Sequence, residues 1–174
     1  MNQKITIYNR GFTLIEMMIV VAILGILMMF VTSSYLSYVS RVKVSELLNL
    51  AGPYKNEVVE YYAENGKCPN NESSPDGGFP MKTEINSPTL YSLSVGPSGK
   101  EFLVGGKKVA SVCRISMVFR GENRDKQVPR NLKNKTIRLR MAMTDSGVYW
   151  QCSVAADGGV GIPFKDLPHV CRNT

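Results

Sequence analysis

The hydrophobic pattern begins with a long apolar run over residues 12–31, in which Glu16 is the one ionisable side chain. A helix over this range would extend about 30 Å, enough to cross the hydrocarbon core of a bilayer. The sequence therefore predicts a helix of membrane-spanning length that carries a single carboxylate near its start.

The helical pattern continues beyond the apolar run. Side chains at roughly three-to-four spacing predict a stripe that packs against a sheet. Gly52-Pro53 predicts a kink or a break, and Gly66 predicts the end of the helix. The positions of the stripe are Tyr35, Leu36, Val39, Val42, Glu46, Leu47, Leu50, Tyr54, Val58 and Tyr61.

The second half of the chain has the pattern of a β-sheet. Residues 67–88 are rich in Asn, Ser, Gly and Pro, which predicts a loop. Alternating apolar and polar residues then predict short strands joined by tight turns, an arrangement typical of an antiparallel sheet laid on the helix. The fold class is therefore α+β. The expected strands are 89–95, 101–104, 109–119, 137–143 and 148–153.

Composition supports a folded, exported domain. The 174 residues are 44% hydrophobic and 20% charged, which is ordinary for a globular protein. Lys4 and Arg10 precede the apolar run, and such basic residues keep the N-terminal side in the cytoplasm. A plain signal anchor would have the same pattern.

The candidate chemistry is sparse. The single histidine, His169, and four cysteines without a C-x-x-C pair offer no metal site, and we expect no cofactor and no enzymatic activity. An even number of cysteines in an exported domain favours two disulfides. Four cysteines allow three pairings, and the spacing leaves the choice open.

One motif is far more specific. Gly11-Phe12-Thr13-Leu14-Ile15-Glu16, followed by an apolar helix, resembles the N-terminus of type IV pilins. The resemblance implies that a membrane peptidase cleaves the Gly11–Phe12 bond and that Phe12 is then N-methylated. It also implies that Glu16 pairs with the N-terminal ammonium of a neighbouring subunit during assembly.

The resemblance also divides the chain. It implies a leader peptide over 1–11, a transmembrane and assembly helix over 12–35, and a globular head over 36–174. The Trp150-x-Cys152 strand and the Pro168-x-x-Cys171 segment resemble the pilin pattern too. The fold implied is the type IV pilin fold with a disulfide-closed C-terminal loop. The resemblance implies a disulfide between Cys152 and Cys171, and Cys68 and Cys113 would then remain as the second pair.

The function that the resemblance implies is structural. The chain would polymerise with other pilin subunits into a surface fibre that serves adhesion, twitching motility or DNA uptake. Its partners would be the prepilin peptidase and methyltransferase and the assembly machinery of the inner membrane. It would lie in the inner membrane as a single-pass protein before assembly and in the extracellular pilus afterwards.

A basic run motivates an alternative function. The net charge is +7, and residues 120–140 hold eight cations against two acids. Such a run predicts a surface for DNA or an anionic host polymer, as in a DNA-binding or adhesive minor pilin. A solvated loop and strand face, or charges complementary to a neighbouring subunit, explain it equally. The cations are Arg120, Arg124, Lys126, Arg130, Lys133, Lys135, Arg138 and Arg140.

A third interpretation is a pseudopilin of a type II secretion system, because pseudopilins share the N-terminal motif. The two-cysteine loop near the C-terminus argues against it, since the pseudopilin domain usually has a different, often calcium-stabilised form.

Overall fold

The computed structural model describes residues 11–85, 87–121, 127–154 and 161–172, and of residues 31–33 only the backbone. By their internal contacts, residues 1–36 and 37–174 form two compact units, and each is described by itself. Most of the leader predicted over 1–11 therefore lies outside the described residues, as do Arg124 and Lys126 of the basic run.

One α-helix, α1 (Leu14–Asn65), accounts for the first part of the chain. The expected break at Gly52-Pro53 is wrong, because the helix continues through Pro53. A proline inside a helix removes one backbone hydrogen bond and clashes with the preceding turn, and the burial of Ala51 and Val58 on either side of Pro53 offsets this cost. The predicted end is confirmed: the Gly66 N–H donates to the Tyr62 carbonyl at 2.9 Å with Gly66 in a left-handed conformation, at a φ of 65°.

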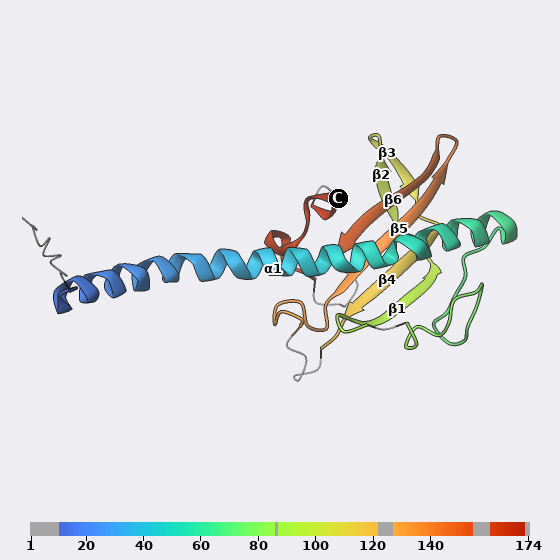
Figure 1. Cartoon of the computed structure of the whole chain (residues 1–174). Coiled ribbons are helices and arrows are strands. Elements are labelled where there is room, and N and C mark those ends of the chain that lie inside the picture. The colour runs from blue at the N-terminus through green and yellow to red at the C-terminus, as the bar shows by residue number, and fades with distance from the viewer. Residues whose placement is uncertain (1–10, 86, 122–126, 155–160, 173–174) are drawn as a thin grey trace, which may run out of the picture. The chain divides into compact units, whose positions relative to one another are not determined.

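Four antiparallel strands form the main sheet, in the order β1-β4-β5-β6 (Figure 1). A second, two-stranded sheet pairs β2 with β3 and interrupts the sequence between β1 and β4. The strands are β1 (Leu90–Pro97), β2 (Glu101–Val104), β3 (Lys107–Ala110), β4 (Cys113–Phe119), β5 (Thr136–Thr144) and β6 (Gly147–Val154).

The predicted strand over 109–119 is two strands in the structure. The chain leaves the hairpin at Ser111, whose N–H donates to the Lys100 carbonyl at 2.8 Å. The next N–H, of Val112, donates to the Met141 carbonyl at 2.8 Å. The backbone therefore changes partners between β3 and β4, a change that alternation of side chains does not reveal.

The core of the second unit lies between α1 and one face of the main sheet (Figure 1). On the helix, Val44, Leu47, Ala51 and Val58 are fully buried. The predicted stripe is right for Leu47 and Val58 but wrong for Tyr35, Leu36 and Val42, which are exposed. The sheet contributes Leu93, Val95, Ile115, Met117, Ile137, Leu139 and Met141 to the same core.

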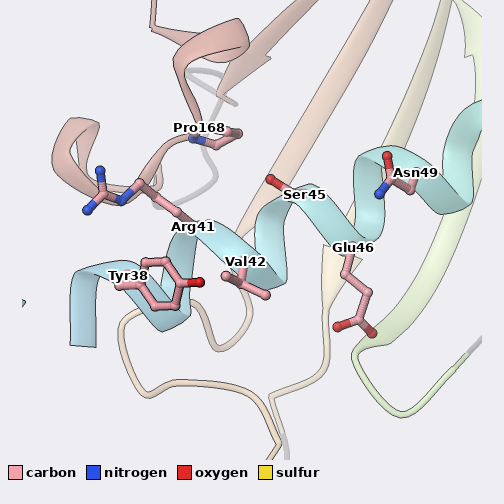
Figure 2. A pocket seen from close by; sticks show the side chains of 7 residues that line it. All are labelled: Tyr38, Arg41, Val42, Ser45, Glu46, Asn49 and Pro168. Atoms are coloured by element: carbon pink, nitrogen blue, oxygen red, sulfur yellow. The ribbon is translucent and has the colours of Figure 1, made fainter. Parts of the chain in front are cut away.

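The C-terminal loop is closed by a disulfide between Cys152 on β6 and Cys171, with 19 residues of separation and a Cα–Cα distance of 5.0 Å. Closing a loop of this size stabilises the fold by about 3 kcal/mol in chain-entropy models. The loop contains two short 3-10 helices, η1 (Phe164–Asp166) and η2 (His169–Cys171). Between them, Pro168 lies against α1 (Figure 2).

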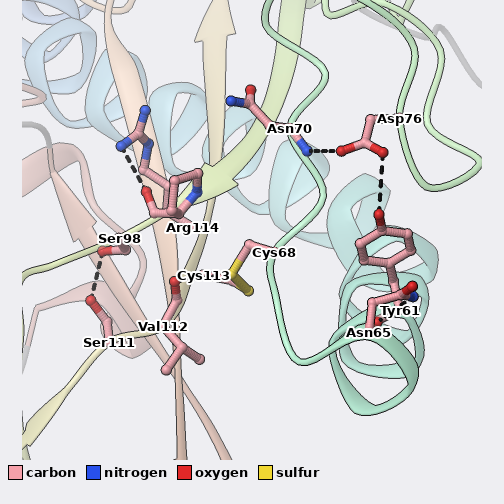
Figure 3. Close-up of a disulfide and its surroundings, with 11 residues drawn as sticks. Tyr61, Asn65, Cys68, Asn70, Asp76, Ser98, Ser111, Val112, Cys113 and Arg114 are labelled. Atoms are coloured by element: carbon pink, nitrogen blue, oxygen red, sulfur yellow. Dashed lines mark hydrogen bonds between the residues drawn. A yellow bond between two sulfur atoms is a disulfide. The ribbon is translucent and has the colours of Figure 1, made fainter.

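The second disulfide joins Cys68, just after α1, to Cys113 at the start of β4, with a Cα–Cα distance of 5.6 Å (Figure 3). Both pairs are those that the resemblance to pilins implies. Beside this bond, the Asp76 carboxylate accepts hydrogen bonds from the Tyr61 hydroxyl at 3.2 Å and from the Asn70 N–H at 2.8 Å (Figure 3).

Asn71 fixes the loop between α1 and β1 to the sheet. Its side chain is fully buried. The Asn71 Nδ2 donates to the Pro80 carbonyl at 2.9 Å and to the Leu93 carbonyl at 3.3 Å, and its Oδ1 accepts from the Val95 N–H at 2.8 Å. Asn71 thus gives hydrogen-bonding partners to the backbone of Leu93 and Val95 and joins the loop to β1.

We expect Asn71→Ala to lower the free energy of unfolding by about 2–4 kcal/mol, because buried backbone groups left without a partner cost about 1–3 kcal/mol each. Urea unfolding of the full chain in a nonionic detergent, followed by Trp150 fluorescence, measures the loss. Asn56→Ala, at an exposed site on α1, is the control and should change stability by less than about 0.5 kcal/mol. Equal losses in the two variants would contradict the role of Asn71.

Candidate functional site

The residues around the predicted cleavage site lie outside the helix. Gly11, Phe12 and Thr13 precede the first helical residue, Leu14, and are exposed, with Phe12 at 80%. An unwound, accessible segment is what a peptidase needs, since it must bind extended backbone. The position of Gly11 and Phe12 is therefore compatible with cleavage between them.

Glu16 and Thr13 form a reciprocal cap at the start of α1. The Thr13 N–H donates to Glu16 Oε2 at 2.8 Å, and the Thr13 hydroxyl donates to the same oxygen at 2.7 Å. In return, the Glu16 N–H donates to Thr13 Oγ1 at 3.3 Å. This is the capping box of a T-x-x-E sequence, and it holds the carboxylate at the helix start.

Thr13 is a residue of this site that the sequence-based predictions do not include. The signal was present, because a Thr followed three residues later by Glu, just before an apolar run, marks a helix N-terminus. The motif was instead interpreted through its resemblance to a cleavage and methylation site.

The first third of α1 has no hydrophobic core of its own. From Leu14 to Phe30 every side chain is exposed, and the large hydrophobic ones range from 48% at Val20 to 78% at Met29. A water-soluble domain rarely exposes so large an apolar surface. Among the described residues no single helix meets the length and hydropathy expected of a membrane span, whereas Leu14–Phe30 and Ser34–Asn65, taken together as a bent pair, do.

A groove of about 630 Å³ runs along α1 in the second unit (Figure 2). Figure 2 shows that it is formed by one side of the helix and by Pro168 from the C-terminal loop. Exposed apolar surface of Tyr38 and Val42 lies beside polar groups in it. The lining residues are Tyr38, Arg41, Val42, Ser45, Glu46, Asn49 and Pro168.

A buried polar chain holds the C-terminal loop at this groove. Ser40 of α1 and Asp166 of η1 are both buried, and Asn131 lies between them. The Asn131 Nδ2 donates to Ser40 Oγ at 2.9 Å and to Asp166 Oδ2 at 2.6 Å. Three segments that are far apart in the sequence are therefore joined by these side chains.

Glu46 connects α1 to the start of β1. Partial burial raises the pKa of its carboxyl group, but hydrogen bonds from Lys43 and Thr89 and the charge of Lys43 outweigh burial, so the pKa is lowered overall. The Lys43 Nζ lies 2.7 Å from Oε2, and the Thr89 hydroxyl donates to Oε1 at 2.7 Å.

The described residues of the predicted basic run lie in different surroundings. Arg120 is occupied internally: its Nε and Nη2 donate to the Ser87 carbonyl at 3.3 and 3.1 Å. Arg130, Lys133 and Lys135 lie in the connection between β4 and β5. Arg138 and Arg140 lie on β5, where they line a hollow with Lys100 and Arg114.

Comparison with known proteins identifies two matching regions, one at the N-terminal motif and one over the predicted head. Residues 40–172 match the family model for pilin, the bacterial filament protein, and residues 8–32 match the prokaryotic N-terminal methylation motif. The fimbrial protein EcpC of Eikenella corrodens is 33% identical over 165 residues, covering 95% of this chain and 92% of the relative. A type IV major pilin protein PilE1 of Neisseria gonorrhoeae is 33% identical over 176 residues, covering 95% and 94%.

A shorter match is closer in sequence. The type IV major fimbrial protein FimA of Dichelobacter nodosus is 39% identical over 89 residues, which cover 51% of this chain and 54% of the relative.

We expect the contribution of Glu46 to stability to depend on pH. Because its pKa is lower in the folded state, the contribution is present above the ordinary pKa of about 4.5 and is lost as the pH falls through the folded value. Glu46→Gln should therefore lower the free energy of unfolding at pH 7 by up to about 1 kcal/mol, the range for a half-exposed ion pair, and this loss should become smaller as the pH falls below about 4.5.

The measurement is urea unfolding of the full chain in detergent from pH 7 to pH 3. Glu60→Gln, at an exposed position of α1, is the control. A difference between wild type and Glu46→Gln that stays constant over this range would contradict the assignment.

Proposed function

Since the chain belongs to the pilin family of bacterial filament proteins, we propose that it polymerises through its N-terminal helix into a type IV pilus. As expected from the sequence, the family is structural and not enzymatic. The observation that carries the proposal is the exposed apolar surface of α1 from Leu14 to Phe30. Such a surface is stable in a bilayer before assembly and among identical helices afterwards.

Processing precedes assembly in this proposal. A prepilin peptidase cleaves the Gly11–Phe12 bond on the cytoplasmic side, and Phe12 becomes the N-methylated first residue. The match of residues 8–32 to the methylation motif and the exposure of Gly11 and Phe12 support this step. Because cleavage occurs before the apolar run, the helix stays in the mature subunit.

Glu16 is the assembly residue. A carboxylate inside a bilayer costs roughly 2.5–3.5 kcal/mol on insertion scales, so it needs a partner there. In the single chain that partner is Thr13. In the fibre it is the N-terminal ammonium of a neighbouring subunit, whose position sets the axial register between helices.

The division of the chain follows from these roles. Residues 1–11 are the leader, 12–35 the membrane and assembly helix, and 36–174 the head. The two compact units, which divide after Leu36, support this boundary. The subunit waits in the inner membrane, is moved by the pilus assembly machinery, and ends in the extracellular fibre.

Fibres of this kind serve adhesion, twitching motility or DNA uptake, and we assign the chain to the fibre itself instead of to a specialised minor subunit. The full-length relatives named as major pilins and fimbrial proteins favour this role. The alternative of a DNA-binding or adhesive minor pilin rested on one continuous basic run, and in that run Arg120 donates to a backbone carbonyl instead of facing a ligand. The matches favour a pilin over a secretion pseudopilin.

We expect Gly11→Ile to block removal of the leader, because a branched side chain beside the scissile bond obstructs the peptidase. Intact-mass measurement of the chain from membranes would show the full precursor. Gly25→Ala, a glycine change inside the apolar helix, is the control and should be processed normally. A processed Gly11→Ile chain would refute the cleavage site.

We expect Glu16→Val to be inserted and processed but to reduce fibre yield at least about tenfold, because loss of the ion pair removes the register signal at a cost of more than about 1.4 kcal/mol. Sheared surface fibres, quantified against total membrane subunit, measure the yield. Ile15→Val next to it keeps the surface apolar and should assemble normally. Normal piliation of Glu16→Val would remove the assembly role of Glu16.

A further inference from the structure

One hollow of the second unit, of about 380 Å³, is lined by residues of both sheets. On one side, β2 of the small sheet supplies Glu101, Phe102 and Leu103. On the other side, β5 and β6 of the main sheet supply Arg140 and Gln151. Ligand pockets in proteins measure about 300–1,000 Å³, so this hollow has room for a small molecule. The assembly proposed for α1 uses none of these residues.

Strand register brings Arg140 and Gln151 together. The two residues are directly opposite each other in the pairing of β5 with β6. They lie on the face of the sheet opposite the core, because side chains alternate between faces along a strand and Leu139, Met141 and Cys152 are buried in the core. A guanidinium group and a side-chain amide at facing positions offer several N–H donors to one group of a ligand.

Glu101 and Arg140 line this hollow with opposite charges and are not paired with each other. Within the described residues, neither side chain makes a hydrogen bond or an ion pair, and the side-chain amide of Gln151 makes no hydrogen bond either. By contrast, Glu72 and Arg114 pair at 2.9 Å. An acid and a base that line one hollow without meeting are complementary to a ligand that carries both charges itself.

The hollow also has an apolar part. Leu103 is 61% exposed, whereas its neighbour Phe102 is buried. Leu103 and Glu101 lie on the same side of β2, because they are two positions apart on a strand. Val154 of β6 lines the hollow from the main sheet. A ligand whose charged end reaches Glu101 can therefore place an apolar group against Leu103.

The lining of the hollow includes an unsatisfied hydroxyl group. Ser153 lies two positions beyond Gln151, on the same face of β6, and lines the hollow. Its Oγ is buried and has no hydrogen-bond partner among the described residues. Buried polar groups nearly always have a partner, in the protein or in a bound molecule. The unsatisfied hydroxyl therefore favours a polar occupant in this hollow.

We propose that this hollow binds a small zwitterion, an α-amino acid with an apolar side chain. Its carboxylate accepts hydrogen bonds from the Arg140 guanidinium and the Gln151 amide, and its ammonium group donates to the Glu101 carboxylate. Its apolar side chain lies against Leu103. A simple anion or a simple cation would pair with one of the two charged side chains and leave the other without a partner.

The test is NMR titration of the isotope-labelled full chain in nonionic detergent with L-leucine and with two analogues that each lack one charge. N-acetyl-L-leucine has no ammonium group, and L-leucinamide has no carboxylate. We expect saturable binding of one leucine per chain and at least about tenfold weaker binding of each analogue, because each loses one charge-assisted contact. The titration uses single subunits, so its result is independent of fibre formation.

Two variants assign the charges of the ligand to their partners. Glu101→Gln should weaken leucine binding at least about tenfold but that of N-acetyl-L-leucine less than about twofold, because this analogue lacks the group that Glu101 binds. Arg140→Gln should likewise weaken leucine binding at least about tenfold but that of L-leucinamide less than about twofold.

Glu60→Gln and Arg130→Gln are the matched controls, because they remove the same charges from exposed positions that do not line the hollow. Each should change the affinity for leucine less than about twofold. Absence of saturable leucine binding, binding of both analogues as tight as that of leucine, or equal weakening of leucine and analogue by the Glu101 and Arg140 variants would each overturn the proposal.

Discussion

The structure depends on how α1 covers the apolar face of the main sheet. The four strands place Leu93, Ile115, Ile137 and their neighbours on one side, and α1 covers them with Val44, Leu47, Ala51 and Val58. The same helix has no such partner from Leu14 to Phe30. The two parts of α1 therefore differ: in the described residues the second part is covered by the sheet, whereas the apolar first part is exposed.

The family and the fold class could be predicted from the sequence, because the signals for them are local. Glu16 within an apolar run, the Gly11-Phe12 junction and the two cysteines near the C-terminus are local signals that need no tertiary contacts. The helix stripe was traced through Tyr35 and Val42, which are exposed, because spacing alone does not say which face meets the sheet. The change of partner at Ser111 and Val112 is set by backbone hydrogen bonds and leaves no mark in side-chain alternation.

The basic residues show the same limit of sequence-based prediction, because position along the chain does not say which charges lie together. Residues that are close in sequence, such as Arg120 and Arg138, have unrelated roles, because one is bound to the Ser87 carbonyl and the other lies on β5. Arg114 and Arg140 are 26 positions apart in number but directly paired in the sheet. Charge density along a chain is therefore a poor guide to charge density on a surface, and strand register decides which cations act together.

The cap at the start of α1 bears on the assembly role that we propose for Glu16. Thr13 satisfies one oxygen of Glu16 with two hydrogen bonds, worth about 1 kcal/mol for a helix cap. Among the described residues, the second oxygen and the negative charge have no comparable partner. A neighbouring ammonium in a low-dielectric environment offers a stronger, charge-assisted interaction. Under the proposed function, the ion pair would therefore replace the cap when subunits come together.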